Sequence, residues 1–453
     1  MTTPVLLDIE TIQRAYATGA LTPSRLVMSL VEKIEACPDQ AIFITRPPSA
    51  ALLAEAALLD VQGPQGRALY GIPYAVKDNI DVAGLPTSAA CPGFAYMPAR
   101  DATSTARLRA AGALMLGKTN LDQFATGLNG TRSPYGAPRC VFNADYVSGG
   151  SSSGSAVAVA AGLACFALGT DTAGSGRVPA GFNNIAGLKP SIGRIPATGM
   201  VPACQSLDCV SIFANTAKDC AIVLHAVQGD DGQDPYGRPA RDAVLPTRPR
   251  AGILAPGDRL FHDPDYPALY QNALDHATAL GWILTPIPYA PFRTLAEALY
   301  GGPLAAERLA AIPDFYARHA DAIDPVVRAI LDKAAGFSAA EAFAEQHRVQ
   351  ALRRQAQAVL DGVDILLLPT APYHPSLAEM RAEPLEANEK LGLYTNFVNQ
   401  LDLAGIAVPA GFTPAGLPFG VTLLGSAFSE VALCALAGSL HTAIGAGSGL
   451  ARA

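Results

Sequence analysis

Residues 148–177 read SGGSSSGSAVAVAAGLACFALGTDTAGSGR, two Gly/Ser turns that enclose an apolar segment. The first turn leads into 156–164 without a polar spacer, which is typical of a packed turn at the N-terminus of a helix. The following residues, CFALGTDT, predict a buried strand that ends in the second turn. In isolation a Gly/Ser run also fits a flexible linker, and a phosphate loop would need the G-x-x-x-x-G-K-[ST] pattern that is missing here.

Helix-like and strand-like patterns alternate on both sides of these turns. Helical spacing of apolar residues predicts helices at 7–36, 49–60, 103–113, 304–320, 339–361 and 429–442. Short apolar or alternating runs predict strands at 69–80, 114–120, 250–256, 363–372 and 418–425. This alternation predicts an α/β fold with a large mixed β-sheet covered on both faces by helices.

The composition is that of a chain that can bury a large core. Of its 453 residues 50% are hydrophobic and 16% charged, and no linker-like segment divides them. We therefore expect a single domain over 1–453. Within it, we expect a catalytic core at about 66–225 and a substrate-pocket region at about 226–400.

Charge and cysteine usage exclude several classes of protein. The net charge of −7 argues against a nucleic-acid binder, and no apolar run reaches the roughly 20 residues of a membrane span. The first residues lack the pattern of a signal peptide. The eight cysteines are scattered without a CxxC pair, and no histidine spacing suggests a metal site. We expect a cytoplasmic protein without a metal or another cofactor.

The second Gly/Ser turn contains the candidate nucleophile, Ser175. A serine hydroxyl needs a base, and none of the seven histidines lies in the Gly/Ser-rich core. His374, which follows a predicted strand, fits a structural histidine better. Lys77 ends an apolar strand, where burial could lower its pKa from about 10.4 and make it a base. Alternation would send Asp78 to the opposite face, although an exposed lysine at a strand end is the other interpretation.

Three ordered blocks carry a resemblance to the amidase signature family. They are Val76–Asn79, Gly149–Gly154 and Gly169–Ser175. Ser175 lies 24 residues after Ser151 (175 − 151), and Lys77 lies 74 residues before it (151 − 77), spacings similar to those of the family's Ser-cisSer-Lys triad. The resemblance covers nearly the whole chain. It implies that Ser175 is the nucleophile, Ser151 the bridging serine after a cis peptide, and Lys77 the base.

The turn around the nucleophile can also supply an oxyanion hole. Backbone N–H groups that converge on a developing oxyanion contribute about 3 kcal/mol each to the stability of the transition state. We expect these donors to come from Thr172, Ala173, Gly174 and Ser175. Ser153 and Asp171 are predicted to support the network rather than to take part in the chemistry.

Two further segments, 122–136 and 206–211, are similar to those of allophanate hydrolases. The resemblance implies hydrolysis of the terminal amide of allophanate through an acyl-enzyme, with release of ammonia and N-carboxycarbamate. Such a small anionic substrate needs a fixed cation, and an arginine can pair bidentately with a carboxylate.

The resemblance also implies a set of substrate-binding residues. Tyr300 and Arg308 match the pair that binds the substrate carboxylate, although an aromatic residue and an arginine on a surface helix are the alternative. Gly127 is expected to contribute its backbone at the amide end. Arg177 is the rival partner for the carboxylate, or it holds the turn by pairing with an acid such as Asp171 or Asp208.

Other interpretations stay open. Allophanate hydrolases usually carry a C-terminal domain, which we expect to be absent here, and the resemblance suggests a homodimer. Another carboxylated amide, such as carboxybiuret or malonamate, is an alternative substrate. The chain could also be an amidotransferase-type subunit that works within a larger complex. A non-enzymatic scaffold would leave the lysine and the two serines at these spacings unexplained.

Overall fold

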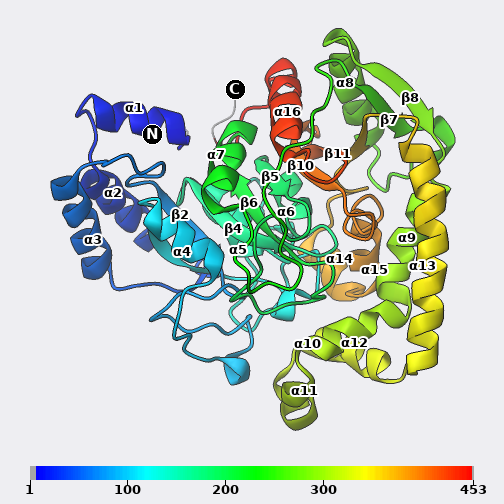
Figure 1. Cartoon of the computed structure of the whole chain (residues 1–453), viewed down its shortest axis with the longest axis horizontal. Coiled ribbons are helices and arrows are strands. Elements are labelled where there is room, and N and C mark those ends of the chain that lie inside the picture. Colours follow the sequence, from blue (N-terminus) through cyan, green and yellow to red (C-terminus); the bar gives the residue numbers. More distant parts are fainter. Residues whose placement is uncertain (1–6, 451–453) are drawn as a thin grey trace.

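The computed structural model describes residues 7–450, apart from the side chains of 300 and 301, and its strands form one sheet (Figure 1). The described strands are β1 Phe43–Thr45, β2 Pro73–Lys77, β3 Leu114–Thr119, β4 Phe166–Asp171, β5 Ala186–Lys189, β6 Cys209–Ala214, β7 Arg250–Leu254, β8 Ile283–Ile287, β9 Ile365–Pro369, β10 Ala404–Phe412 and β11 Pro418–Gly425. Their order across the sheet is β1-β3-β2-β4-β6-β5-β10-β11-β9-β7-β8.

The sheet is mixed, as the alternation of elements predicted. Strand β2 pairs in parallel with β3 and β4, and β7 pairs in parallel with β8 and β9. The strands between these two groups are antiparallel, including the pair of β5 with β10. Strands that are about 220 residues apart in sequence therefore lie side by side at the centre of the sheet.

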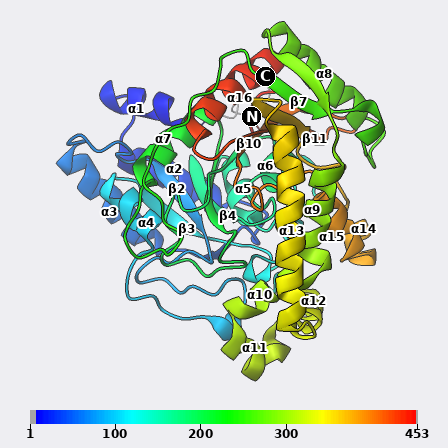
Figure 2. The same cartoon turned by 45° about the vertical axis from the view of Figure 1, so that its right-hand side comes forward.

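Helices flank the sheet on both sides (Figures 1 and 2). They are α1 Ile9–Ala17, α2 Pro23–Glu35, α3 Ser49–Gln62, α4 Thr103–Ala110, α5 Ser153–Ala160, α6 Val178–Phe182, α7 Ala217–Val227, α8 Tyr266–Ala279, α9 Ala290–Gly301, α10 Ala306–Ala311, α11 Pro313–His319, α12 Pro325–Ala335, α13 Ala339–Leu360, α14 Leu377–Ala382, α15 Glu386–Leu391 and α16 Glu430–Ile444. In the described residues, no helix combines the length and apolar character needed to cross a membrane.

Local sequence explains where several helices begin and end. Thr22 caps α2 by accepting the backbone N–H of Arg25, and Pro23 takes the first helical position, where its missing N–H costs nothing. The predicted helix 304–320 is instead divided into a short 3₁₀ turn, α10 and α11. Pro313 starts α11, because proline cannot continue the preceding helix.

The core surrounds the two strands that lead to the predicted site. Every residue of β2 and β4 is buried, which fits central strands that are covered on both faces. Helix α5 packs against both strands, and α6 packs against β5, β10 and β11. The carboxyl ends of β2 and β4 lie at the same edge of the sheet, because the two strands are parallel. This edge holds Lys77 and the turn that follows Asp171.

Candidate active site

The three predicted catalytic side chains form one hydrogen-bonded chain at this edge. The Lys77 Nζ donates to Ser151 Oγ at 2.8 Å, and Ser151 Oγ donates to Ser175 Oγ at 3.0 Å. The peptide bond between Gly150 and Ser151 is cis, as the resemblance predicts. Lys77 ends β2, Ser151 lies in the turn before α5, and Ser175 lies in the turn after β4. Three segments far apart in sequence thus bring lysine and serine side chains into contact.

Lys77 is in an environment that favours its neutral form. Its side chain is fully buried, and this burial lowers its pKa to about 7, while Asp122, Asp208 and Asp171 oppose the shift. A second contact holds the amine, because Nζ also donates to Thr170 Oγ1 at 2.7 Å.

Asp78 takes no part in this contact, as strand alternation predicted. It pairs with the buried Lys118 at 3.2 Å and accepts the backbone N–H of Ser88 at 3.0 Å. The lysine that ends β2 is therefore not neutralised by the carboxylate that follows it.

Asp171 and Arg177 brace the turn that carries Ser175. The Arg177 guanidinium donates to both carboxylate oxygens of Asp171 at 2.9 Å, and this pair is completely buried. Arg177 also lies 3.3 Å from the carbonyl oxygen of Thr395. The predicted role of Arg177 as a partner for the substrate carboxylate is not supported by this geometry, because Asp171 already occupies its planar fork. The alternative, that Arg177 holds the turn, fits these contacts.

The backbone of the same turn corrects the predicted set of oxyanion donors. The N–H of Gly174 donates to Asp171 Oδ1 at 3.0 Å, so Asp171 already uses this donor. In the described part of the chain, the N–H groups of Thr172, Ala173 and Ser175 donate to no protein acceptor. A Cβ on Gly174, whose φ is +141°, would overlap the side chain of Thr395, so only glycine fits there.

The loop that contains Gly127 lies against the predicted nucleophile, Ser175. The Gly127 carbonyl oxygen lies 3.4 Å from Ser175 Oγ. The buried carboxylate of Asp122 organises this loop by accepting the N–H groups of Asn129, Gly130 and Arg132 at 3.0 to 3.2 Å. Gly127 is thus positioned beside the hydroxyl of the predicted nucleophile, and Asp122 is a supporting residue that the sequence did not single out.

Ser153, which was predicted to support the triad, braces the first turn from a greater distance. Its hydroxyl donates to the carbonyl oxygen of Asn120 at 3.3 Å. Its neighbour Ser152 makes the contact with the catalytic strand, because its hydroxyl donates to the carbonyl oxygen of Thr170 at 3.1 Å and accepts the N–H of Thr170 at 3.2 Å. The serine next to the triad therefore aligns Thr170 with Lys77.

Arg308 reaches the site from α10. Its side chain is buried, and Nη1 donates at 3.2 Å to Thr126 Oγ1, one residue before Gly127. Tyr300 lies in α9, but its side chain is outside the described part of the structure. Thus Arg308 is close to the residue whose carbonyl faces the nucleophile.

Asp208 connects the turn after β4 with the segment around Ala203. It accepts the hydroxyl of Thr172 and the N–H groups of Ala203 and Cys204, the latter two at 2.7 and 3.1 Å. Burial raises the pKa of Asp208 to about 6, and the positive charge of Arg308 opposes this rise. The sequence named Asp208 only as a possible partner of Arg177, because nothing local shows that it contacts the oxyanion turn.

His374 lies away from this chemistry, as expected for a structural histidine. Its ring stacks on Phe182 with 3.9 Å between centroids, and Nε2 lies 2.7 Å from the carbonyl oxygen of Val147. Burial lowers its pKa to about 4, so it is neutral at ordinary pH.

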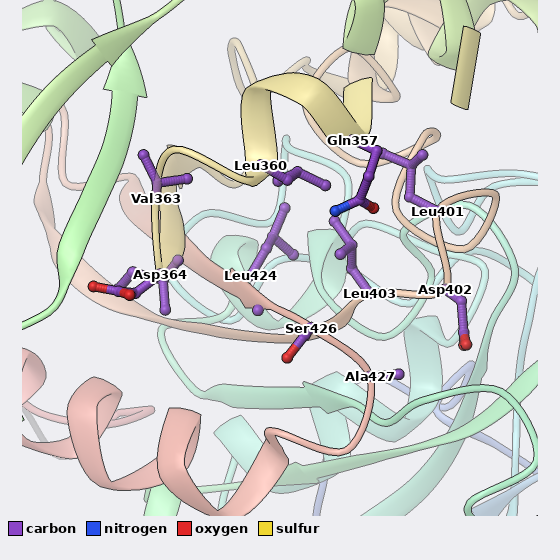
Figure 3. Close-up of a pocket in the computed structure, with 12 residues that line it drawn as sticks. Gln357, Leu360, Val363, Asp364, Leu401, Asp402, Leu403, Leu424, Ser426 and Ala427 are labelled. Carbon is purple, nitrogen blue, oxygen red and sulfur yellow. The ribbon is translucent and has the colours of Figure 1, made fainter. Parts of the chain in front are cut away.

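A separate cavity of about 220 Å³ lies beside β11 and the end of α13 (Figure 3). Leu360, Leu403 and Leu424 form apolar walls, and the carboxylates of Asp364 and Asp402 lie to either side of them. No residue of the triad lines this cavity, so it is distinct from the candidate active site.

Comparison with known proteins identifies the class of this chain. The model of the amidase family matches residues 25–434. This match spans most of the chain, including both Gly/Ser turns and Lys77. The chain therefore belongs to the amidase family, which confirms the resemblance seen in the sequence.

Two individual proteins resemble this chain over most of its length. The urea amidolyase of Lachancea kluyveri is 43% identical over 428 residues, which are 92% of this chain and 23% of that protein. The chain thus spans about a quarter of the length of this relative. A glutamyl-tRNA(Gln) amidotransferase subunit of Streptococcus pneumoniae is 31% identical over 93% of either chain.

Solved structures agree with this fold. A selenomethionine-substituted allophanate hydrolase of Kluyveromyces lactis matches with a TM-score of 0.91 and 40% identity. The match covers 98% of this chain and 74% of that one. The predicted α/β fold with a large mixed sheet is therefore confirmed.

Proposed function

We propose that this chain hydrolyses the terminal amide of allophanate, releasing ammonia and N-carboxycarbamate. The observation that carries the proposal is the contact chain from Lys77 through Ser151 to Ser175, with Arg308 bonded to the residue before Gly127. The likeness to an allophanate hydrolase and to urea amidolyases supports the choice of substrate.

In this proposal, Ser175 attacks the carbonyl carbon of the amide. Neutral Lys77 accepts a proton from Ser151, which accepts one from Ser175, because hydroxyl hydrogens can reorient along the same contacts. The N–H groups of Thr172, Ala173 and Ser175 stabilise the oxyanion. The proton returns to the departing nitrogen as the C–N bond breaks, and ammonia leaves an acyl-enzyme. Water then attacks the acyl carbon by the same route and restores the Ser175 hydroxyl.

The carboxylate of the substrate would pair with Arg308. A guanidinium has a planar fork that matches a carboxylate, and burial strengthens the interaction by excluding water. Arg308 is buried and lies on the side of the Gly127 loop. The amide of allophanate would then face Ser175 while its carboxylate faces α10. Tyr300, near the end of α9, is the second proposed partner of this carboxylate.

Release of ammonia from allophanate by the purified chain, measured beside Ser175→Ala, tests this function. We expect turnover by the wild type and less than about one thousandth of it in the variant, because a serine hydrolase without its nucleophile keeps only a small residual rate. Circular dichroism of both proteins checks that the variant is folded.

Other outcomes would change the assignment. An active Ser175→Ala would remove Ser175 as the nucleophile. Turnover of malonamate or carboxybiuret without turnover of allophanate would keep the triad and change the substrate. The 31% identity to an amidotransferase subunit makes that class the second candidate, favoured if the chain acts only with added partner subunits. A homodimer in the cytoplasm stays a prediction, which light scattering and cell fractionation would check.

A further inference from the structure

Helix α10 contacts two separate loops of the active site through adjacent residues. Arg308 Nη1 donates to Thr126 Oγ1 at 3.2 Å. Glu307 accepts the backbone N–H of Ser206 at 2.6 Å and its hydroxyl at 2.8 Å. Thr126 immediately precedes Gly127, whose carbonyl faces the nucleophile, and Ser206 is two residues before Asp208, which accepts the hydroxyl of the oxyanion turn. The helix is thus attached to two segments that each lead to the surroundings of Ser175.

We propose that Thr126 and Ser206 are positioning residues that fix Arg308 and thereby set the preference of the enzyme for carboxylated amides. This inference rests on the proposed function and deepens it. Neither residue needs to touch the substrate. Thr126 orients the guanidinium directly, whereas Ser206 holds the backbone of α10 through Glu307.

Helix α10 depends on such contacts because little within its own sequence fixes it. It has six residues, no side chain caps its N-terminus, and it ends before Pro313. Isolated helices of this length are unstable in water, so tertiary contacts determine where it lies. An arginine side chain also loses up to about 2 kcal/mol of conformational entropy when it is fixed. A hydrogen bond made before substrate arrives would take up part of this cost in advance.

Apolar side chains also pack around helices α10 and α11. Phe315 contacts Phe94 and Phe124 edge to face or at a tilt, and Leu309 and Ile312 join the same cluster. Helices α10, α11 and α12 gather at one end of the molecule, below α9 and α13 (Figures 1 and 2). Loss of a polar contact at Thr126 or Ser206 should therefore leave the helices folded while loosening the guanidinium.

The charge of the nearby Asp208 bears on why Thr126 contacts Arg308. Asp208 is a buried carboxyl group that interacts electrostatically with Arg308, so its ionised form attracts the guanidinium. The same guanidinium would attract an incoming substrate carboxylate. The hydroxyl of Thr126 holds Nη1 toward the Gly127 loop. Loss of this hydroxyl would remove one of the contacts that hold the guanidinium in this position.

Steady-state kinetics on a carboxylated and a neutral amide test the proposal. The substrates are malonamate or allophanate and, for comparison, propionamide. We expect Thr126→Val to raise KM for the carboxylated amide about tenfold, since a hydrogen bond to a charged group contributes about 1.5 kcal/mol or more. The ratio of kcat/KM for carboxylated over neutral amide should fall by the same factor. Ser206→Ala should lower this ratio less, and Thr126→Ser should restore it.

A matched control variant separates a displaced Arg308 from a general loss of folding or activity. Thr294→Val makes the same chemical change on α9, where the hydroxyl donates to the carbonyl oxygen of Ala290 in the same helix, and should not alter the ratio. An unchanged ratio in Thr126→Val, or equal losses on both amides, overturns the inference. A wild type that does not prefer carboxylated amides overturns the proposed function itself, and this result is obtained before any variant is compared.

Discussion

At the scale of single residues, the proposed chemistry depends on whether Lys77 is neutral or protonated. A lysine in water is charged below pH 10, whereas burial of Lys77 lowers its pKa to about 7. Three buried aspartates limit this fall, and each is held by N–H or hydroxyl donors of the active-site turns. The site therefore holds a base that is half neutral near physiological pH.

The pH dependence of kcat/KM should report this lysine. Because only neutral Lys77 can accept a proton, kcat/KM should rise with pH through about 7 and level off above it. Thr170→Val removes a hydroxyl that accepts from the ammonium, so it should move the midpoint to lower pH. Initial rates from pH 5 to 9 measure both midpoints, and a midpoint that moves upward in the variant would contradict the assignment.

The residues of the triad could be predicted because they lie in ordered motifs. The roles of Thr126, Thr170 and Asp208 could not, because each depends on a partner from another segment. The same limit explains the error at Gly174: sequence alone does not show that the side chain of Asp171 turns back to bind its N–H.

At the scale of secondary-structure elements, β10 is one of the strands that were not predicted from the sequence, and it contains glycine and proline. Strand β10 reads AGIAVPAGF, and such residues usually weaken a strand. At Gly405 a Cβ would meet the side chain of Leu424 on the adjacent strand, so close packing explains the glycine. Strands such as β4 and β9 were predicted because each begins with a run of apolar residues, all of them buried.

Helix α1 is held in place by a buried carboxylate. Asp219 on α7 accepts the backbone N–H of Ile9 at 3.2 Å, and only 1% of Asp219 is exposed. Burial raises the pKa of Asp219 to about 7, with Asp8 adding to the rise and Lys218 opposing it. Ionisation of Asp219 places a charge in the core, so the fold should lose stability when this group ionises.

The free energy of unfolding should fall as the pH rises through the titration range of Asp219. The folded state holds the Asp219 proton more tightly than the unfolded state, so the free energy of unfolding declines between about pH 4 and pH 7. Asp219→Asn removes this dependence. Between pH 5 and pH 8 the wild type should therefore lose at least ~1 kcal/mol more unfolding free energy than the variant does. Urea unfolding at both pH values measures the difference, and parallel curves for the two proteins would refute it.

At the scale of the whole molecule, buried ion pairs connect distant parts of the chain. Arg194, which follows β5, pairs with Glu430 at the start of α16, and both side chains are completely buried. Glu430 also accepts the N–H of Ser191 at 2.6 Å. Asp242 gives Arg194 a second carboxylate, but half of that side chain is exposed.

Removal of the buried carboxylate should be costly. Glu430→Gln removes the buried carboxylate and leaves Arg194 paired with the half-exposed Asp242, so we expect the free energy of unfolding to fall by about 3 kcal/mol. Asp402→Asn, which breaks the partly exposed pair with Arg238, should cost less than about 1 kcal/mol. Guanidinium unfolding followed by fluorescence compares the two variants, and similar losses in both would contradict this ranking.

The pairing of β5 with β10 has a consequence for how the protein is made. Ser175 emerges from the ribosome long before Thr395 and Asn399. Both later residues contact the turn around Ser175: Thr395 contacts Arg177, and Asn399 donates to the carbonyl oxygen of Asp171 at 2.8 Å. Until β10 emerges, the nascent chain carries an unpaired apolar strand edge, the kind of surface that invites aggregation. The proposed nucleophile can thus become reactive only after Asn399 has been synthesised, and a chaperone that shields β5 would raise the yield.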